Sequence, residues 1–186
     1  MAIETNLNPT HPGLPRQPFL ETPRLRLFRW EAGDADSFRA ISSDPEVMRY
    51  INGGRPWSAA ELDEYIGRQI GHERTRGFCL WRMENTAAET IGMCGLQPVS
   101  IGGREEVEIG WWLAQRYWGQ GLGTEAARRV LDFAWSGAKL ERVIAIVMPE
   151  NRASQNIMKK IGMTYEREDQ HKGFRVVLYA IVGDRR

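Results

Sequence analysis

Hydrophobic and polar positions along the chain predict strands and helices that follow one another in an interleaved order. Every-other-residue alternation at residues 24–27 predicts a first strand, and apolar residues at helical spacing predict a helix over residues 34–43. A second helix begins after Ser58, which has Glu61 three residues further on, the spacing of a capping box. Three strands are predicted next, over residues 78–83, 90–99 and 107–114.

The second half of the chain continues with a helix from residue 124 to about residue 135, whose apolar positions recur with helical periodicity. A nearly all-apolar run over residues 142–148 indicates a strand that is covered on both faces. A helix over residues 151–161 and strands over residues 163–167 and 174–182 complete the series. The order predicts a mixed sheet with helices on both faces, an α/β domain of α+β character.

Length and composition indicate one domain over residues 21–186, preceded by a proline-rich tail over residues 1–20 that we expect to be extended, and disordered unless it docks. The 25 basic and 24 acidic residues leave a net charge of +1, so charge favours neither nucleic acid nor a membrane surface as a partner. Cys79 and Cys94 lie in apolar segments, as expected for buried, reduced thiols of a cytoplasmic protein. No segment has the pattern of a signal peptide or a membrane span.

A glycine-rich segment, Trp-Gly-Gln-Gly-Leu-Gly at residues 118–123, lies between the strand over residues 107–114 and the helix that starts at residue 124. Glycine allows positive φ and a close approach of backbone to ligand. The start of a helix presents unpaired N–H groups and partial positive charge. The combination predicts a binding site for an anion, most often a phosphate.

Other interpretations of this segment fit less well. A P-loop needs a lysine after its last glycine, and no lysine occurs between Trp81 and Arg129. Gly121, Gly123 and Ala126 match a dinucleotide fingerprint, but a connector separates them from the preceding strand, and the acid that follows begins its strand instead of ending it. A glycine-rich turn without a ligand would lose backbone entropy for no evident gain.

The chain resembles the GNAT acetyltransferase superfamily, and within it the branch of ribosomal-protein-alanine N-acetyltransferases. The resemblance spans about residues 22–183. It rests on three ordered blocks: Glu108-Ile109-Gly110-Trp111-Trp112-Leu113, Tyr117-Trp118-Gly119-Gln120-Gly121-Leu122-Gly123-Thr124-Glu125-Ala126, and Asn151-Arg152-Ala153-Ser154 with Lys160-Ile161-Gly162-Met163. The resemblance implies a mostly antiparallel sheet of about seven strands flanked by four helices, splayed between the fourth and fifth strands. The chain departs from the family pattern at Trp118, where arginine or glutamine is usual.

The resemblance also implies that the chain transfers an acetyl group from acetyl-CoA to a primary amine, either a protein N-terminus or a small-molecule amine. The pantetheine arm would lie between the splayed strands, and backbone N–H groups would bind the diphosphate, with help from Gln120 or from an arginine such as Arg128 or Arg129. The residues expected to bind acetyl-CoA are Trp112, Leu113, Ala114, Gly119, Gln120, Gly121, Leu122, Gly123, Thr124, Asn151 and Ser154.

Two residues are candidates for catalysis. Glu108 shares a strand face with Gly110 and Trp112, where a carboxylate could deprotonate the amine, although a charged side chain on a solvated face explains it too. Carboxylates near the last hairpin are the other candidates for the base: Glu166, Glu168 and Asp169. Ser154 lies inside the apolar arc set by its helix neighbours, whereas Gln155 lies outside it. The Ser154 hydroxyl therefore either contacts the CoA sulfur or bonds back to its own helix.

The expected partners are therefore acetyl-CoA and an amine acceptor, with no metal ion, nucleic acid or membrane, in a monomer or homodimer. Two alternatives stay open. One is a non-catalytic acyl-CoA-binding or regulatory module that keeps the glycine loop but lacks a base. The other is an enzyme with a different donor, such as succinyl-CoA.

Overall fold

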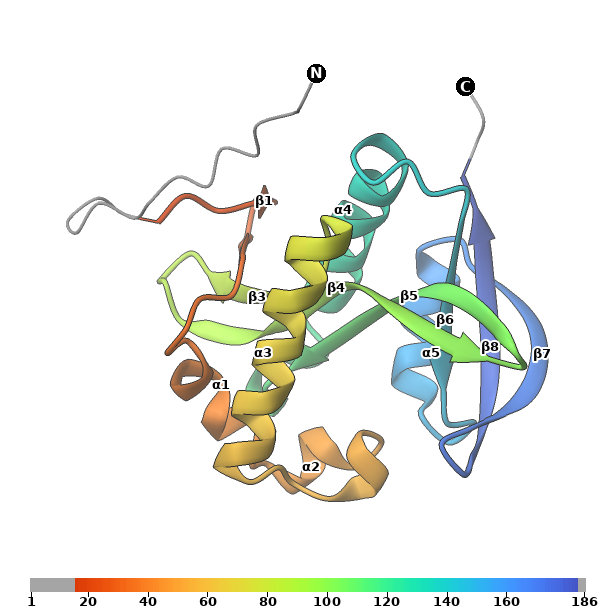
Figure 1. Ribbon diagram of the computed structural model, residues 1–186, viewed down its shortest axis with the longest axis horizontal. Coiled ribbons are helices and arrows are strands. Elements are labelled where there is room, and N and C mark those ends of the chain that lie inside the picture. Colours follow the sequence, from red (N-terminus) through yellow and green to blue (C-terminus); the bar gives the residue numbers. More distant parts are fainter. Residues whose placement is uncertain (1–15, 184–186) are drawn as a thin grey trace.

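The structure, a computed structural model, describes residues 16–183 and is built around an eight-stranded mixed sheet (Figure 1). Along the sheet the strands lie in the order β1-β2-β3-β4-β5-β6-β8-β7. The strands are β1 (Leu20–Glu21), β2 (Leu25–Phe28), β3 (Leu80–Asn85), β4 (Thr90–Ile101), β5 (Arg104–Leu113), β6 (Arg142–Val147), β7 (Thr164–His171) and β8 (Phe174–Val182). All neighbouring pairs are antiparallel except β5 and β6, which are parallel.

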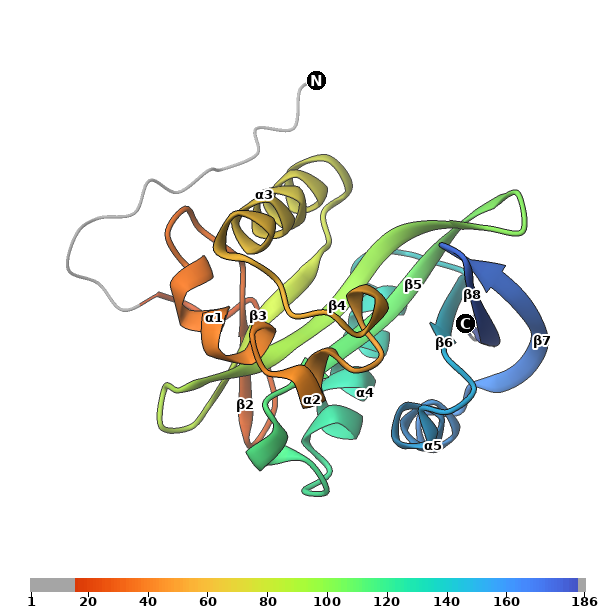
Figure 2. The ribbon, with the colours of Figure 1, turned by 90° about the horizontal axis from the view of Figure 1, so that it is seen from below.

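Helices cover both faces of the sheet. The α-helices are α1 (Ala35–Ser42), α2 (Pro45–Met48), α3 (Ala59–Arg76), α4 (Leu122–Ser136) and α5 (Arg152–Lys160), with 3-10 turns η1 (Asn52–Gly54) and η2 (Gln115–Tyr117). Figure 2 shows α1 and α3 on one side of the central strands and α4 on the other. The capping box predicted at the start of α3 is confirmed, because Ser58 and Glu61 each bond the other's backbone N–H.

Two apolar clusters hold the sheet. The larger lies on both faces of β2, β3 and β4 and includes the fully buried Trp81 and Met93. Cys79 and Cys94 belong to it as free thiols, and burial raises both of their pKa values, as expected of structural cysteines. The smaller cluster joins the far end of β4 to β6 and β8 through residues Val99, Ile101, Ile144, Val176, Leu178 and Ala180.

The sheet opens between β5 and β6. Their ladder has one register pair, Glu108 with Ile144, after which β5 continues to Leu113 beside β4 and β6 continues to Val147 beside β8. The smaller apolar cluster holds the two halves together where they meet, so the other end is free to diverge. This is the splay expected from the resemblance; it lies between β5 and β6 because an additional first strand shifts the numbering.

Several elements differ from the sequence-based prediction. Within residues 16–183 there are eight strands instead of about seven and five α-helices instead of four, because α2 forms, with η1, in a segment where no helix was predicted. The missed strand, β1, comes from the end of the predicted tail: Leu20 is buried and pairs with Leu27 of β2. Residues 1–15 of that tail lie outside the described residues. None of the helices within residues 16–183 has the length and apolar character that a bilayer span requires.

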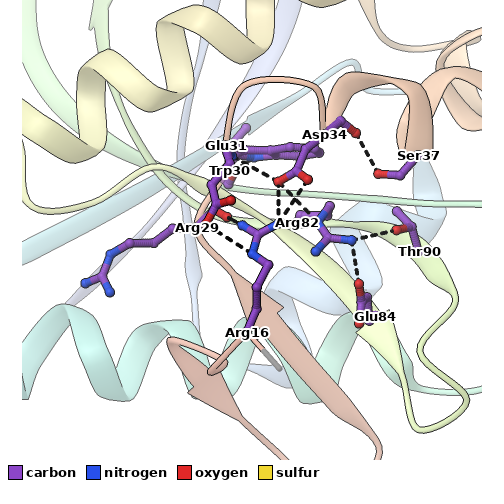
Figure 3. Close-up of polar contacts among 10 residues, drawn as sticks. Arg16, Arg29, Trp30, Glu31, Asp34, Ser37, Arg82, Glu84 and Thr90 are labelled. Atoms are coloured by element: carbon purple, nitrogen blue, oxygen red, sulfur yellow. Dashed lines mark hydrogen bonds and ion pairs between the residues drawn. The ribbon is translucent and has the colours of Figure 1, made fainter. Parts of the chain in front are cut away.

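A buried charged cluster anchors the start of α1 to the sheet (Figure 3). Arg82 of β3, only 8% exposed, donates to Glu84 and to the Thr90 hydroxyl at 3.1 Å, and its Nε lies 3.7 Å from Asp34, the residue before α1. Arg16 donates to both Asp34 oxygens at 2.9 Å. Since a buried charge without partners costs several kcal/mol, this cluster fixes where α1 begins.

Candidate functional site

The glycine-rich segment forms a tight loop between η2 and α4. Gly119 and Gly121 have φ values of 74° and 79°, in the left-handed region that glycine adopts without steric cost. Gly121 is the N-cap residue of α4, and no side chain caps the helix there. The helix starts at Leu122, two residues earlier than predicted, because the left-handed Gly121 ends the loop. Its first N–H groups have no intrahelical acceptor, so this end of α4 suits an anion.

Gly123 allows α4 and α5 to approach each other. A Cβ at this position would lie 3.0 Å from Cδ1 of Ile157 on α5 and 3.5 Å from Cδ1 of Leu113. Any larger residue would push α5 away from the loop or fill the space between them. Gly123 is visible in the sequence, but only the structure shows that it allows α4 and α5 to pack closely.

A cleft of about 370 Å³ opens beside this loop, between the end of β5 and the first turn of α5. Its volume falls in the range of small-molecule sites. Most of the residues expected to bind acetyl-CoA line it: Trp112, Leu113, Gly119, Gly121, Leu122, Gly123, Thr124, Asn151 and Ser154. Ala114 and Gln120 do not, and the Gln120 side chain instead donates to the Arg116 carbonyl at 2.9 Å.

The backbone at the end of β5 is only partly available to a ligand. The Ala114 N–H donates to the Ile91 carbonyl at 2.9 Å, and the alternation of an antiparallel pair then turns Trp112 toward β4 as well. Leu113 faces the opening toward β6, but its carbonyl accepts from the Trp118 indole at 2.8 Å. Of the three residues Trp112, Leu113 and Ala114, only Leu113 therefore keeps a backbone N–H that could donate to a ligand in the cleft.

Asn151 and Ser154 lie together at the start of α5 and both line the cleft. The Asn151 side chain accepts from the Ser154 N–H at 3.1 Å, which confirms the predicted N-cap. Within the part of the chain that the structure describes, the Ser154 hydroxyl has no hydrogen-bond partner. Gln155, expected outside the apolar arc, is buried: it donates to the Pro149 carbonyl at 2.7 Å and accepts from Tyr179 at 3.4 Å.

Glu108 lies at the point where β5 and β6 begin to diverge, and, although it is on the same strand as Trp112, it is not among the residues that line the cleft. Burial raises its pKa from 4.5 to about 7, against the opposing effects of hydrogen bonds from the Gln97 amide and the Ile146 N–H. The Gln97 bond is 2.9 Å long. A carboxyl group with this pKa is protonated in about half of the molecules at neutral pH, so it can take up and release a proton there. Its charge also raises the pKa of Tyr65, after the larger effect of burial.

The other candidate bases lie farther from the opening, on the edge strand β7. Glu166 pairs with Arg142 at 2.7 Å and Arg167 at 2.6 Å, and Asp169 pairs with Arg167 at 3.1 Å. Glu168 is half exposed and 4.0 Å from Arg175. Because β8 and β6 lie between β7 and the opening, the structure does not bring these carboxylates to the cleft.

Of the residues between α1 and α3 that line the cleft, the sequence pointed to Tyr50 as a neighbour of the acceptor but gave no reason to choose Glu46 or Arg49. These three residues lie in and just after α2. Nearby, an added Cβ on Gly53 would lie 3.3 Å from the Phe174 ring, so η1 and the start of β8 touch. These contacts join segments about 120 residues apart, and no local pattern in the sequence signals them.

A stacked group of aromatic rings supports Trp112 from the face that carries α1 and α3. The Tyr65 ring lies 5.4 Å from the Trp112 ring and nearly parallel to it, and Trp57 lies 4.9 Å away. Phe38 of α1 completes the group at 5.9 Å. The buried charged cluster at the start of α1 therefore also positions a wall of the cleft.

The chain belongs to the GNAT acetyltransferase family. The family model described as an acetyltransferase (GNAT) domain matches residues 24–164. Among curated proteins, the chain is 34% identical over 150 residues to the uncharacterized protein YkkB of Bacillus subtilis (strain 168), covering 80% of this chain and 86% of YkkB. It is 31% identical over 152 residues to the uncharacterized N-acetyltransferase p20 of Bacillus licheniformis, covering 79% and 83%.

Solved structures show the same fold. RimL, a ribosomal L7/L12 alpha-N-protein acetyltransferase solved with coenzyme A, superposes with a TM-score of 0.71 at 17% identity, over 88% of this chain and 96% of that one. At that identity the similarity concerns the fold alone. Family membership makes the chain an acyltransferase, and the resemblance seen in the sequence is confirmed.

Proposed function

We propose that the chain is an acetyl-CoA-dependent N-acetyltransferase that acetylates a primary amine by direct attack on the thioester. The observation that carries this proposal is the uncapped start of α4, which opens onto a cleft beside the end of β5, where β5 has diverged from β6. The first N–H groups of α4 would bind the diphosphate, and the gap between β5 and β6 would hold the pantetheine arm. The presence of coenzyme A in the RimL structure supports the same use of this fold.

Glu108 is the base in this proposal. An amine must be neutral to attack, and an α-amino group with a pKa near 8 is about one-tenth neutral at pH 7, whereas a lysine near 10.4 is almost fully charged. With a pKa of about 7, Glu108 is well matched to the α-amino group. Glu108 takes the amine proton, directly or through water, while the nitrogen forms its bond to the acetyl carbon.

The remaining steps use the cleft's backbone and hydroxyl groups. The Leu113 N–H donates to the carbonyl oxygen as negative charge develops there. The carbon–sulfur bond then breaks, and the Ser154 hydroxyl donates a hydrogen bond to the departing thiolate. Because a thiol has a pKa near 8.5, this last contribution is modest.

The charge of the cleft favours a monoamine over a polyamine. Among the described residues, its charged lining consists of Glu46, Arg49 and Lys160. A polycation would need several carboxylates for its additional ammonium groups, and this lining offers one. We therefore favour a protein N-terminus or a small monoamine as the acceptor.

The test is release of free thiol from acetyl-CoA in the presence of an acceptor panel: peptides with N-terminal alanine or serine, amino acids, aminoglycosides and polyamines. We expect thiol release with at least one monoamine, and weaker release with polyamines. Binding of acetyl-CoA by calorimetry without thiol release from any acceptor would instead support the non-catalytic module. Tighter binding of succinyl-CoA in a competition would reassign the donor.

We also propose that the protein acts in the cytoplasm as a monomer or homodimer. The two buried, unpaired cysteines are consistent with a reducing compartment. Light scattering of the purified chain, with and without acetyl-CoA, measures the oligomeric state.

A further inference from the structure

The segment between β1 and β2 contacts the glycine-rich segment at residues 118–123, here called the phosphate loop, and the first turn of α4. These contacts join parts of the chain about 100 residues apart. The Thr22 hydroxyl donates to Glu125 Oε1 at 2.6 Å. Arg24 donates to the same carboxylate through its backbone N–H at 3.1 Å and through Nε at 2.7 Å. Glu125, in the first turn of α4, is thus held by three donors from one short segment.

Arg24 also holds one peptide plane of the loop. Its Nη1 donates to the Gln120 carbonyl at 3.0 Å. In a trans peptide the N–H of the next residue points opposite to that carbonyl. The Gly121 N–H is therefore turned away from Arg24, and Gly121 is one of the residues that line the cleft. The hydrogen bond fixes the direction of a donor in the proposed diphosphate site.

The contact also neutralises a carboxylate that would otherwise oppose anion binding at the start of α4. A free carboxylate on Glu125 would repel a phosphate at the same helix end. Burial raises the pKa of Glu125, but hydrogen bonds from Thr22 and Arg24 outweigh it and lower the pKa overall, so the group stays charged and paired. Its side chain is 20% exposed, whereas that of Arg24 is 50% exposed.

The segment itself is anchored on both sides. Phe19, just before β1, lies 5.0 Å from the Trp81 ring of β3 and 5.1 Å from the Phe133 ring of α4. Its N–H donates to the Leu27 carbonyl at 2.7 Å. The β1–β2 turn is therefore attached both to the sheet and to the helix whose start it holds.

From these contacts we propose that Arg24 is a positioning residue for the acyl donor: through Gln120 and Glu125 it holds the phosphate loop in the shape that directs backbone N–H groups at the diphosphate. This inference rests on the proposed function, in which the loop binds acetyl-CoA. Arg24 acts through the loop, and the Thr22 hydroxyl and the Glu125 carboxylate are parts of the same contact.

The test compares Arg24→Gln, Glu125→Gln and the double variant by steady-state kinetics and by calorimetry with coenzyme A. For Arg24→Gln we expect KM for acetyl-CoA and Kd for coenzyme A to rise about 10- to 100-fold, as for loss of hydrogen bonds to a charged group. We expect kcat at saturating acetyl-CoA and KM for the acceptor to change by less than about twofold, since bound donor reacts normally. Arg26→Gln is the matched control, because Arg26 on β2 pairs only loosely with Glu21, at 3.7 Å.

Glu125→Gln separates positioning from simple charge. If Arg24 only supplied positive charge, removing the nearby carboxylate would tighten coenzyme A binding; if it positions the loop, the same change weakens binding. We expect weaker binding, and a double variant no weaker than the weaker single variant, because both changes break one contact. Tighter binding by Glu125→Gln, or additive losses, would overturn the inference. Wild-type protein that fails to bind acetyl-CoA would refute the proposed function instead.

Discussion

Replacement of Glu108 by glutamine should separate the catalytic and structural consequences of burying a carboxyl group. The change keeps the shape and leaves an oxygen to accept from the Gln97 amide, which now donates to Glu108 at 2.9 Å. It removes the group that takes up the proton. Loss of a general base typically costs about 10²- to 10⁴-fold in rate, so we expect kcat to fall within that range while Kd for coenzyme A is retained.

The same variant should become more stable than the wild type at high pH. Burial raises the pKa of Glu108 from 4.5 to about 7 in the folded protein, so between these values the folded state holds a proton that the unfolded state has released. Wild-type stability therefore falls as pH rises through this window, and the penalty is complete above pH 7. At about 1.4 kcal/mol for each pKa unit the full penalty is about 3 kcal/mol, and partial access of solvent to the side chain reduces it.

Urea unfolding of both proteins at pH 5 and pH 8.5, together with pH–rate profiles, tests this reasoning. We expect the stability advantage of Glu108→Gln to be about 1 to 2.5 kcal/mol larger at pH 8.5 than at pH 5, and the wild-type rate to rise with an apparent pKa near 7. The control is Glu168→Gln, which changes a half-exposed side chain on the edge strand β7. It should change neither the pH dependence of stability nor the pH–rate profile. An advantage that is the same at both pH values would refute the buried-carboxyl argument, and an unchanged kcat would remove Glu108 from the mechanism.

Three further variants probe the donor side of the cleft. Gly121→Glu should abolish coenzyme A binding in calorimetry, whereas Gly77→Glu, at the same left-handed conformation on the exposed end of α3, should cost similar stability and leave binding intact. Ser154→Ala should lower kcat by less than about tenfold with no change in melting temperature, because the thiolate leaves readily without help; a larger loss would assign the hydroxyl a greater role. Asn151→Ala should cost about 1 kcal/mol in urea unfolding and raise KM for acetyl-CoA, while Ser58→Ala costs about the same and leaves KM unchanged; equal KM values would limit Asn151 to capping.

Much of the predicted fold and site rested on patterns formed by residues close together in the sequence. The capping box at Ser58 and the N-cap at Asn151 involve residues three positions apart, so their patterns are visible in the sequence. The glycine loop and the strand before it were also visible, because turn and helix-start chemistry depends on neighbouring residues. Together with the resemblance, these were enough to predict the splayed sheet and the place of the cleft.

Features that depend on distant contacts were not predictable. The contact between Arg24 and Glu125 spans 101 positions in sequence, and Arg24 looked like an ordinary strand residue. Gln155 was expected outside the apolar arc because of its angular position on the helix, and its hydrogen bonds with Tyr179 and the Pro149 carbonyl explain its burial. Helix α2 has four residues, too few for periodicity, although Asp44 caps it and Pro45 begins it. The raised pKa of Glu108 requires the surroundings that the fold supplies.

The single register pair between β5 and β6 also closes the gap between these two strands at Glu108. In the proposed function, a pantetheine arm that enters from the glycine-rich loop would stop at the β5–β6 junction near Glu108. The distance from the start of α4 to Glu108 would therefore limit the length of the acyl group that the arm carries. An acetyl group would end beside the carboxyl, whereas each extra methylene would press against it. Discrimination among acyl chain lengths is then expected to come from the point at which the two strands meet.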